Sequence, residues 1–271
     1  MKKILPLIIS LFLWGCHSQK RTINVLFVGN SLTYYNDMPQ LLQEMLNETD
    51  PNIKIDQITF PGVSLQSHLN FMVDPSKENS RFEKQLGDTT STEKKLLVKP
   101  WDVVILQEGT VRVLIPESKD SLVIPSIQRI KGLVPNKDCR FAIFHTWVSK
   151  HEYPKEYCYS SFLITREISD EQFCSTKFIN FEQEAKAVDE AYTFIANATN
   201  IEKSNNGNIA NRFLSSYPDI EIFEDDQHPS MAGAFLNACI FYEMLTNKKA
   251  KNLIFSGKLD PKTSKIIKNF I

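Results

Sequence analysis

Three short apolar runs constrain the fold of this chain more than any other feature of its sequence. They lie at residues 23–28, 101–106 and 140–144. Each is apolar at most positions and rich in Val, Ile, Leu or Phe, which is typical of a strand buried on both faces of a sheet. Segments with a helical spacing of apolar residues lie between and after these runs, at 39–48, 118–133 and 181–197. Alternating strands and helices predict an open, doubly wound α/β sheet.

The remaining segments extend this pattern. Residues 53–60 alternate between apolar and polar side chains and end at Pro61-Gly62, so we expect a second strand followed by a loop. The other expected elements are helices at 63–72 and 231–245, a polar connection at 73–97 with a helix near 81–86, a short apolar run at 220–223 and a surface helix within 252–271. Residues 149–178 are rich in aromatic and charged side chains, break the alternation and predict an excursion from the domain.

The N-terminus has the features of an export signal. Lys2 and Lys3 precede a short apolar run at 4–14, which is too short to span a bilayer comfortably. The run ends in Leu13-Trp14-Gly15-Cys16, which resembles the lipobox of bacterial lipoproteins. This resemblance implies a signal peptide at 1–15, lipidation of Cys16 and a tether at 16–21 before one domain at 22–271. The expected location is the bacterial cell envelope, on the outer membrane or the cell surface, with the lipid as the only membrane attachment.

Charge and residue spacing argue against a nucleic-acid partner and against a metal site. The 271 residues include 31 Lys and Arg against 32 Asp and Glu, for a formal net charge of −1. With no strong charge and no basic cluster interleaved with aromatics, we expect no nucleic-acid partner. The cysteines form no C-x-x-C pair and the histidines lack ligand spacing, so we expect no metal site.

Cys158 and Cys174 flank one irregular segment and are able to form a disulfide after export, but the sequence leaves this pairing open.

Polar residues follow the predicted strands where each strand ends. Ser31 comes after the first strand, Gly62 after the second, Gln107 and Glu108 after the third, and His145 after the fourth. Ligands of doubly wound sheets bind beyond the carboxyl ends of the strands, so we expect these residues to converge on one edge. Ser31 also lies where a strand passes into a helix, and the unpaired N–H groups of a helix start stabilise negative charge. By itself this position indicates a turn as readily as a nucleophile.

A serine nucleophile requires a base, and the base requires an orienting acid. Among the five histidines, His228 is distinguished by Asp225 three residues earlier. On a loop, this Asp is able to fold back onto the imidazole Nδ1–H and leave Nε2 free to accept the serine proton. The alternative for the pair is a helix-capping Asp beside an incidental His.

Two blocks of sequence resemble the SGNH/GDSL hydrolases. The first is Gly29-Asn30-Ser31-Leu32-Thr33, with Tyr34-Tyr35-Asn36-Asp37-Met38-Pro39 after it, and the last runs from Asp225 through His228 to Leu236. The usual Gly-Asp-Ser-Leu is Gly-Asn-Ser-Leu here, as in a bacterial subgroup. The resemblance covers roughly residues 23–245, with 149–178 matching least. No Gly-x-Ser-x-Gly elbow is present, which argues against the α/β-hydrolase fold.

The resemblance implies a flavodoxin-like three-layer α/β/α sandwich with a mostly parallel sheet, and ester hydrolysis without a cofactor. Ser31 is expected to attack the ester carbonyl, His228 to act as base and then acid, and Asp225 to orient His228. The oxyanion hole is expected to use the backbone N–H groups of Ser31 and Gly62. The family's third block, Gly-x-Asn-Asp, is absent here, and Leu106-Gln107-Glu108-Gly109 stands in its place.

Gln107 is the expected replacement for the family's oxyanion Asn, because its amide NH₂ is a neutral donor. Candidate substrate-binding residues are Asn30, Tyr34, Glu108, His145 and Trp147. Glu108 is alternatively a residue that orders its loop.

An acylated glycan or small molecule is the expected partner, with an acetyl ester preferred. Tyr35 and aromatics of the excursion add possible faces for sugar stacking, although ordinary packing explains each of them equally well. Two alternatives remain open at this point. One is a lysophospholipase or thioesterase on the same fold, and the other is a glycan-binding lipoprotein without activity.

Overall fold

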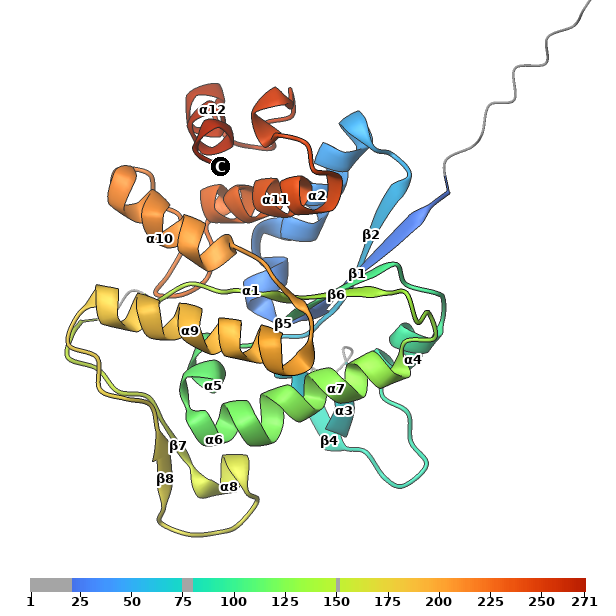
Figure 1. Cartoon of the computed structure of the whole chain (residues 1–271), viewed down its shortest axis with the longest axis vertical. Coiled ribbons are helices and arrows are strands. Elements are labelled where there is room, and N and C mark those ends of the chain that lie inside the picture. Colours follow the sequence, from blue (N-terminus) through green and yellow to red (C-terminus); the bar gives the residue numbers. More distant parts are fainter. Residues whose placement is uncertain (1–20, 75–79, 150–151) are drawn as a thin grey trace, which may run out of the picture.

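Five parallel strands form the central sheet (Figure 1). The computed structural model describes residues 21–74, 80–149 and 152–271. The strands are β1 (Ile23–Gly29), β2 (Ile53–Thr59), β5 (Val103–Gln107), β6 (Arg140–Phe144) and β9 (Glu202–Lys203). They are ordered β2-β1-β5-β6-β9, and each neighbouring pair is parallel. This is the flavodoxin-like order of a doubly wound sheet, so the predicted fold class is confirmed.

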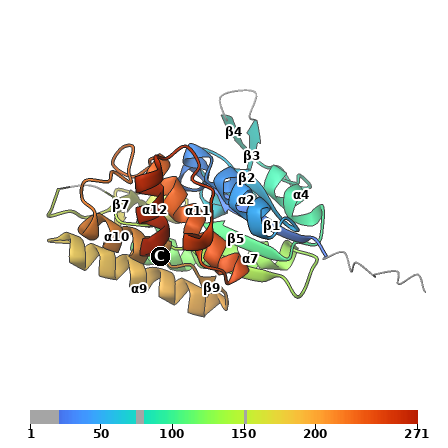
Figure 2. The same cartoon turned by 90° about the horizontal axis from the view of Figure 1, so that it is seen from above.

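Helices cover both faces of the sheet, giving three layers (Figures 1 and 2). One face carries α2 (Met38–Thr49), α10 (Asn206–Ser216), α11 (Met231–Thr246) and α12 (Pro261–Phe270). The other face carries α3 (Leu65–Asn70), α4 (Ser91–Leu97), α5 (Thr110–Leu114), α7 (Ile124–Leu133) and α9 (Phe181–Thr199). Side chains of β1 alternate between the two layers: Val25 and Phe27 join the first, and Leu26 and Val28 the second. All four are fully buried, which explains why this strand is apolar throughout.

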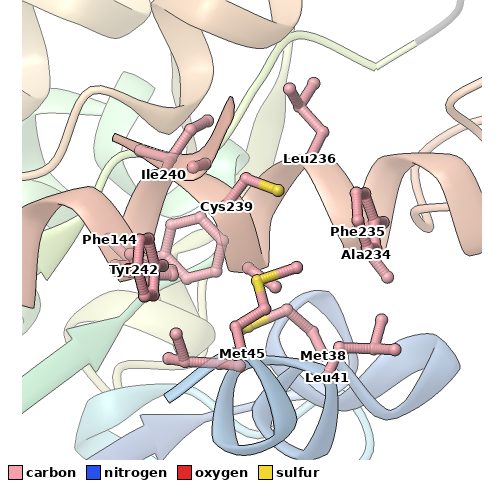
Figure 3. Close-up of a cluster of buried hydrophobic side chains, with 14 of the residues drawn as sticks. Met38, Leu41, Met45, Phe144, Ala234, Phe235, Leu236, Cys239, Ile240 and Tyr242 are labelled. Atoms are coloured by element: carbon pink, nitrogen blue, oxygen red, sulfur yellow. The ribbon is translucent and has the colours of Figure 1, made fainter. Parts of the chain in front are cut away.

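A packed cluster joins α2 to α11, although they lie far apart in the sequence (Figure 3). Met38, Leu41 and Met45 of α2 lie in one core with Phe235 and Cys239 of α11. Burial of large apolar side chains stabilises such a contact by roughly 1.5–3 kcal/mol per side chain. Because α2 follows the first motif and α11 begins within the last one, this contact brings the two motifs together.

Residues 71–74 and 80–83 differ from the sequence-based expectation. β3 (Phe71–Asp74) and β4 (Ser80–Glu83) form an antiparallel ladder. The helix expected near 81–86 is therefore wrong, because residues 81–83 pair with β3 and residues 84–86 are not helical. The helix expected at 63–72 ends at Asn70 as α3, since the next four residues enter β3.

The fifth sheet strand is β9 (Glu202–Lys203), which the sequence did not predict. β9 contains two residues, too few to produce a strand pattern, and α10 follows it without having been predicted. Within 220–223, Phe223 forms an isolated bridge with Pro229. This bridge closes the loop that carries Asp225 and His228.

The excursion contains a small antiparallel ladder of β7 (Cys158–Ser160) and β8 (Gln172–Cys174), with α8 (Ser161–Ile164) between them. A disulfide joins Cys158 to Cys174, which answers the question that the sequence left open. The remaining short elements are α1 (Ser31–Tyr34), η1 (Tyr35–Asp37), α6 (Pro116–Ser118), η2 (Lys119–Val123) and η3 (Ala250–Asn252).

The predicted signal peptide at 1–15, Cys16 and all but the last residue of the predicted tether lie outside the described residues. None of the helices in the described ranges combines the length and the apolar character that a bilayer crossing requires.

Candidate active site

Ser31 is the first residue of α1, directly beyond the end of β1. Asn30 caps this helix, because its side-chain oxygen accepts a hydrogen bond from the Leu32 N–H at 3.1 Å. The Asn30 side-chain amide also donates to the Val63 carbonyl at 3.1 Å, which ties the turn to the loop after β2. Ser31 is thus fixed at a helix start, where backbone N–H groups lack partners within the helix.

Gln107, the last residue of β5, supports the same turn through hydrogen bonds. Its Oε1 accepts hydrogen bonds from the Asn30 N–H at 2.7 Å and from the Thr33 hydroxyl at 3.0 Å. A Cβ atom at Gly29 would lie 2.6 Å from this oxygen, so only glycine permits the approach. β5 therefore contributes to the position of Ser31 through the side chain of its last residue.

His68 of α3 fixes the carbonyl that precedes this turn. Its Nε2 lies 2.9 Å from the Gly29 carbonyl oxygen and its Nδ1 lies 2.6 Å from the Thr92 hydroxyl. A carbonyl only accepts, so Nε2 carries the proton and the Thr92 hydroxyl donates to Nδ1. Burial lowers the pKa of His68 to about 4, and the ring is neutral near pH 7.

Asp225, His228 and Ser31 form a hydrogen-bonded chain. His228 Nδ1 lies 2.6 Å from Asp225 Oδ2, and His228 Nε2 lies 2.9 Å from Ser31 Oγ. Asp225 Oδ1 accepts the backbone N–H groups of His228 at 2.7 Å and Gln227 at 2.8 Å. These backbone bonds, followed by the bond from the His228 ring, lower the pKa of Asp225 to about 2. The carboxylate therefore holds Nδ1–H and leaves the Nε2 lone pair toward Ser31.

Aromatic side chains hold the His228 loop. The Tyr35 ring stacks on the His228 ring, with centroids 4.1 Å apart and planes 14° from parallel. The Trp147 indole N–H donates to the Gln227 carbonyl at 2.9 Å. The Asn36 side-chain amide donates to the Pro229 carbonyl at 2.8 Å. The imidazole is thus constrained from one ring face and through its neighbouring backbone.

A cavity of about 170 Å³ opens beside Ser31. Asn30, Gly62 and Thr110 line it from the loops beyond β1, β2 and β5, and Trp147 lines it beyond β6. Its full lining is Asn30, Ser31, Leu32, Gly62, Gly109, Thr110, Val111, Trp147, Ser149, Tyr157, Tyr159 and Gln227. This is the edge where a doubly wound sheet binds its ligands.

We compared the chain with known protein families, curated proteins and solved structures. No protein-family model matches the chain, and no match is found among curated proteins. Solved structures do match. A DUF4886 family protein from Bacteroides uniformis is 20% identical, with a TM-score of 0.67 over 92% of this chain and 93% of its own. A protein from Slackia heliotrinireducens assigned to the SGNH hydrolases is 20% identical, with a TM-score of 0.55 over 83% of this chain and 100% of its own.

The chain has the SGNH hydrolase fold. A variant of an acetyl xylan esterase from Geobacillus stearothermophilus is also similar, at 13% identity and a TM-score of 0.53 over 83% of this chain and 95% of its own. Within this SGNH fold, the structure brings Ser31, Gly62 and His228 to one edge of the sheet, as the sequence motifs predict.

Gln107 does not occupy the position expected of an oxyanion donor. Its side chain is completely buried and is absent from the cavity lining, because its oxygen is engaged by the turn that carries Ser31. Its Nε2 has no hydrogen-bond partner among the described residues. In this conformation the Gln107 side chain supports the turn that carries Ser31 and does not reach the cavity.

Two other expected substrate-binding residues lie behind the site. His145 is completely buried, its ring packs 5.0 Å from that of Tyr192, and Nδ1 lies 3.8 Å from an Asp189 oxygen. Burial, together with the nearby Lys203 ammonium, lowers the pKa of His145 to about 4. The expectation that His145 contacts substrate is wrong, since its side chain points into the layer of α9.

Glu108 orders its loop, which was the alternative reading of this residue. It is buried and accepts the Leu65 N–H at 2.9 Å and the Gly109 N–H at 2.8 Å. Burial raises its pKa, and the Arg112 guanidinium opposes that rise. Tyr34 is partly exposed and lies outside the cavity lining.

Sequence reasoning missed several residues of the site. Thr110 lines the cavity, and His68 and Thr33 support the Ser31 turn. A Thr and a His in polar segments carry no local signal that separates these roles from surface positions. Among the described residues, Glu156, Cys158 and Cys174 lie close enough to share a metal, but the disulfide joins both sulfurs.

Proposed function

We propose that this protein is a serine esterase that hydrolyses carboxylic esters through an acyl-enzyme. The hydrogen-bonded chain from Ser31 Oγ through His228 to Asp225 carries this proposal. Such a chain activates a hydroxyl that is otherwise a weak nucleophile near pH 7. A protein that only binds glycans has no use for this arrangement, which argues against the non-catalytic alternative.

The reaction follows from the positions of these groups. Ser31 Oγ attacks the carbonyl carbon of the ester while its proton passes to His228 Nε2. The tetrahedral intermediate collapses, the bond to the alcohol oxygen breaks, and His228 returns the proton to that oxygen. Water then attacks the acyl-serine with His228 as the base, which releases the carboxylic acid and restores Ser31.

Two backbone donors are the proposed oxyanion hole. Ser31 N–H lies at the start of α1, and Gly62 lines the same cavity from the loop after β2. Gly62 has a φ of +59°, a backbone conformation that glycine adopts without strain. A third donor from Gln107 is not part of this proposal, because its side chain is buried beneath the Ser31 turn.

The cavity supports a short acyl group and an uncharged substrate. Its volume of about 170 Å³ is well below the roughly 300–1,000 Å³ of sites for drug-sized ligands. None of the described residues that line it is a Lys, Arg, Asp or Glu. An acetylated glycan fits both properties, and a long-chain lysophospholipid fits neither. The similar Geobacillus structure, an acetyl xylan esterase, agrees with this choice.

The proposed location is the bacterial cell envelope, with a lipid on Cys16. The lipobox-like 13–16 segment supports this location. β1 begins at Ile23, at the edge of the sheet opposite the one that carries Ser31. A seven-residue strand spans roughly 23 Å, so the start of β1 and the end that carries Ser31 are separated by about this distance.

Acetate release tests the proposed function. The wild-type protein and a Ser31→Ala variant are assayed on 4-nitrophenyl acetate, 4-nitrophenyl palmitate and acetylated xylo-oligosaccharides. We expect Ser31-dependent hydrolysis of the acetyl esters and little or none of the palmitate. Faster hydrolysis of the palmitate would favour the lipase-type alternative, and a folded wild type without activity on any of these esters would contradict the proposal.

A further inference from the structure

The excursion supplies part of the cavity wall. The described part of this segment, residues 152–178, is called the arm below. Tyr157 and Tyr159 of the arm line the same cavity as Ser31. They lie two positions apart, on either side of Cys158, and strand residues at this spacing share one face. The arm therefore belongs to the candidate site, although it matches the SGNH sequence pattern least.

A buried carboxylate on α9 holds the base of the arm. Glu184 is completely buried and accepts the hydroxyl groups of Tyr153 at 2.8 Å and Tyr157 at 2.7 Å. Lys155 forms an ion pair with the same carboxylate, and its side chain is only 10% exposed. A buried charge is costly unless it is paired and hydrogen-bonded, and these three donors meet that need. All three come from the arm, so Glu184 fixes the arm to the domain.

The backbone of the arm is fixed on both sides of this cluster. Lys155 and Phe178 exchange two backbone hydrogen bonds of 3.0 and 2.8 Å. The Tyr157 N–H donates to the Ser175 hydroxyl at 3.1 Å, and the Ser175 N–H donates to the Tyr157 carbonyl at 2.8 Å. The disulfide joins Cys158 to its ladder partner Cys174. Tyr157 and Tyr159 therefore have defined positions relative to Ser31.

Tyr159 is supported from behind by α5. The Arg112 guanidinium carbon lies 5.6 Å from the centroid of the Tyr159 ring, a cation–π distance. Tyr159 also packs against a small apolar cluster of Ile115, Leu122 and Ile164. A ring supported in this way and open to a cavity has the character of a stacking surface.

We propose that the arm forms a subsite for the sugar ring that carries the ester, with Tyr159 as the stacking surface and Glu184 as the residue that positions the arm. The side chains of Thr110 and Ser149 line the same space, and their hydroxyl oxygens are able to accept hydrogen bonds from the hydroxyl groups of a saccharide. This inference rests on the proposed function, because it names the part of the substrate that is not acyl.

The test compares two acetyl esters that differ in the group next to the ester. The ratio of kcat/KM for acetylated xylo-oligosaccharides to kcat/KM for 4-nitrophenyl acetate is measured in each variant. We expect Tyr159→Ala to lower this ratio by about 5- to 10-fold, the loss of one aromatic contact, mainly through the KM of the oligosaccharide. Tyr159→Phe keeps the ring and is expected to keep the ratio. Glu184→Gln is expected to raise the KM of the oligosaccharide with a smaller change in kcat.

Phe162→Ala is the matched control, because Phe162 is an aromatic residue of the arm that is 46% exposed and is absent from the cavity lining. An unchanged ratio in Tyr159→Ala would overturn the subsite while leaving the esterase intact. If the wild type hydrolyses neither ester, the proposed function fails on its own.

A binding measurement on a variant without the Ser31 hydroxyl tests the subsite separately from catalysis. Calorimetry is expected to show that acetylated xylo-oligosaccharides bind to the Ser31→Ala variant. The double variant Ser31→Ala, Tyr159→Ala is expected to have a Kd that is about 5- to 10-fold higher. No binding to Ser31→Ala, or equal binding to both variants, would overturn the subsite.

Discussion

His228 Nε2 and Ser31 Oγ lie 2.9 Å apart, although 197 positions separate the two residues along the chain. Two packing relationships produce this contact. The parallel register of β1, β2 and β5 brings the ends of these strands to one edge of the sheet. The core between α2 and α11 then holds the loop of His228 against the turn of Ser31. The packing of distant elements, and not the local sequence, therefore brings the proposed nucleophile and base together.

The substitution Asp225→Asn tests the orienting acid. The amide that it introduces offers no carboxylate to hold Nδ1–H, so the imidazole adopts the wrong tautomer. We expect kcat to fall about 10⁴-fold. The Asp225 side chain is 51% exposed, so the free energy of unfolding is expected to change by about 1 kcal/mol or less. Acetate release and urea unfolding measure the two effects, and a variant with normal kcat would remove Asp225 from the mechanism.

Two variants of Gln107 distinguish support of the turn from donation to the oxyanion. Gln107→Ala leaves the Asn30 N–H buried without its acceptor, and we expect a loss of about 1–3 kcal/mol in unfolding free energy together with a lower kcat. Gln107→Glu keeps an accepting oxygen but removes the amide NH₂. Because the structure uses the oxygen, the Glu variant is expected to retain more activity than the Ala variant. The opposite order, with Glu losing roughly 10²–10³ in kcat, would identify Gln107 as an oxyanion donor.

The buried His145 predicts a loss of stability in mild acid. Its pKa is about 4 in the folded protein against about 6.5 in the unfolded chain, so the unfolded chain binds more protons between these values. Stability contributed by neutral His145 is therefore complete above pH 6.5 and is lost as the pH falls toward 4, by on the order of 3 kcal/mol.

Urea unfolding of wild type and His145→Asn at pH 7.5, 6, 5 and 4.5 measures this effect. We expect a shallower pH dependence in the variant. His68 has the same pKa direction and remains in both proteins, so part of the slope persists. Equal slopes in the two proteins would exclude His145 as a source of the acid sensitivity.

Removal of the disulfide is expected to loosen the arm. Cys158 and Cys174 are 16 positions apart, and closing a loop of this length stabilises a chain by about 3 kcal/mol in the loop-entropy model. The double variant Cys158→Ser, Cys174→Ser is expected to be cleaved faster by trypsin within the arm, at Arg166 for example, while the central sheet resists. Mass spectrometry of the fragments locates the cut, and cleavage at an unchanged rate would show that the disulfide is not needed to hold the arm.

Much of this structure was accessible from the sequence, because the signals were local. Apolar runs marked β1, β5 and β6, and two short motifs marked Ser31, Asp225 and His228. The structure joins these three residues by hydrogen bonds, which is the arrangement that the motifs predict.

The failures have a physical reason as well. Gln107 and His145 lie at strand ends, and a strand end does not reveal whether a side chain enters the cavity or the layer behind it. Both enter the protein, as the hydrogen bonds of Gln107 and the packing of His145 against Tyr192 show. β9 is too short to leave a pattern. The position of Tyr159 in the cavity wall depends on the disulfide and on the contacts of Glu184 with the arm. Both join residues that are distant in the sequence.

Covalent labelling tests the central claim most directly. The folded protein is treated with a fluorophosphonate probe at pH 7.5, and the modified peptide is identified by mass spectrometry, with Ser31→Ala and His228→Asn as controls. We predict one adduct, on Ser31, that is absent in Ser31→Ala and forms far more slowly in His228→Asn. A folded wild type that stays unlabelled, or one labelled at another residue, would contradict the assignment of Ser31 as the nucleophile of an esterase.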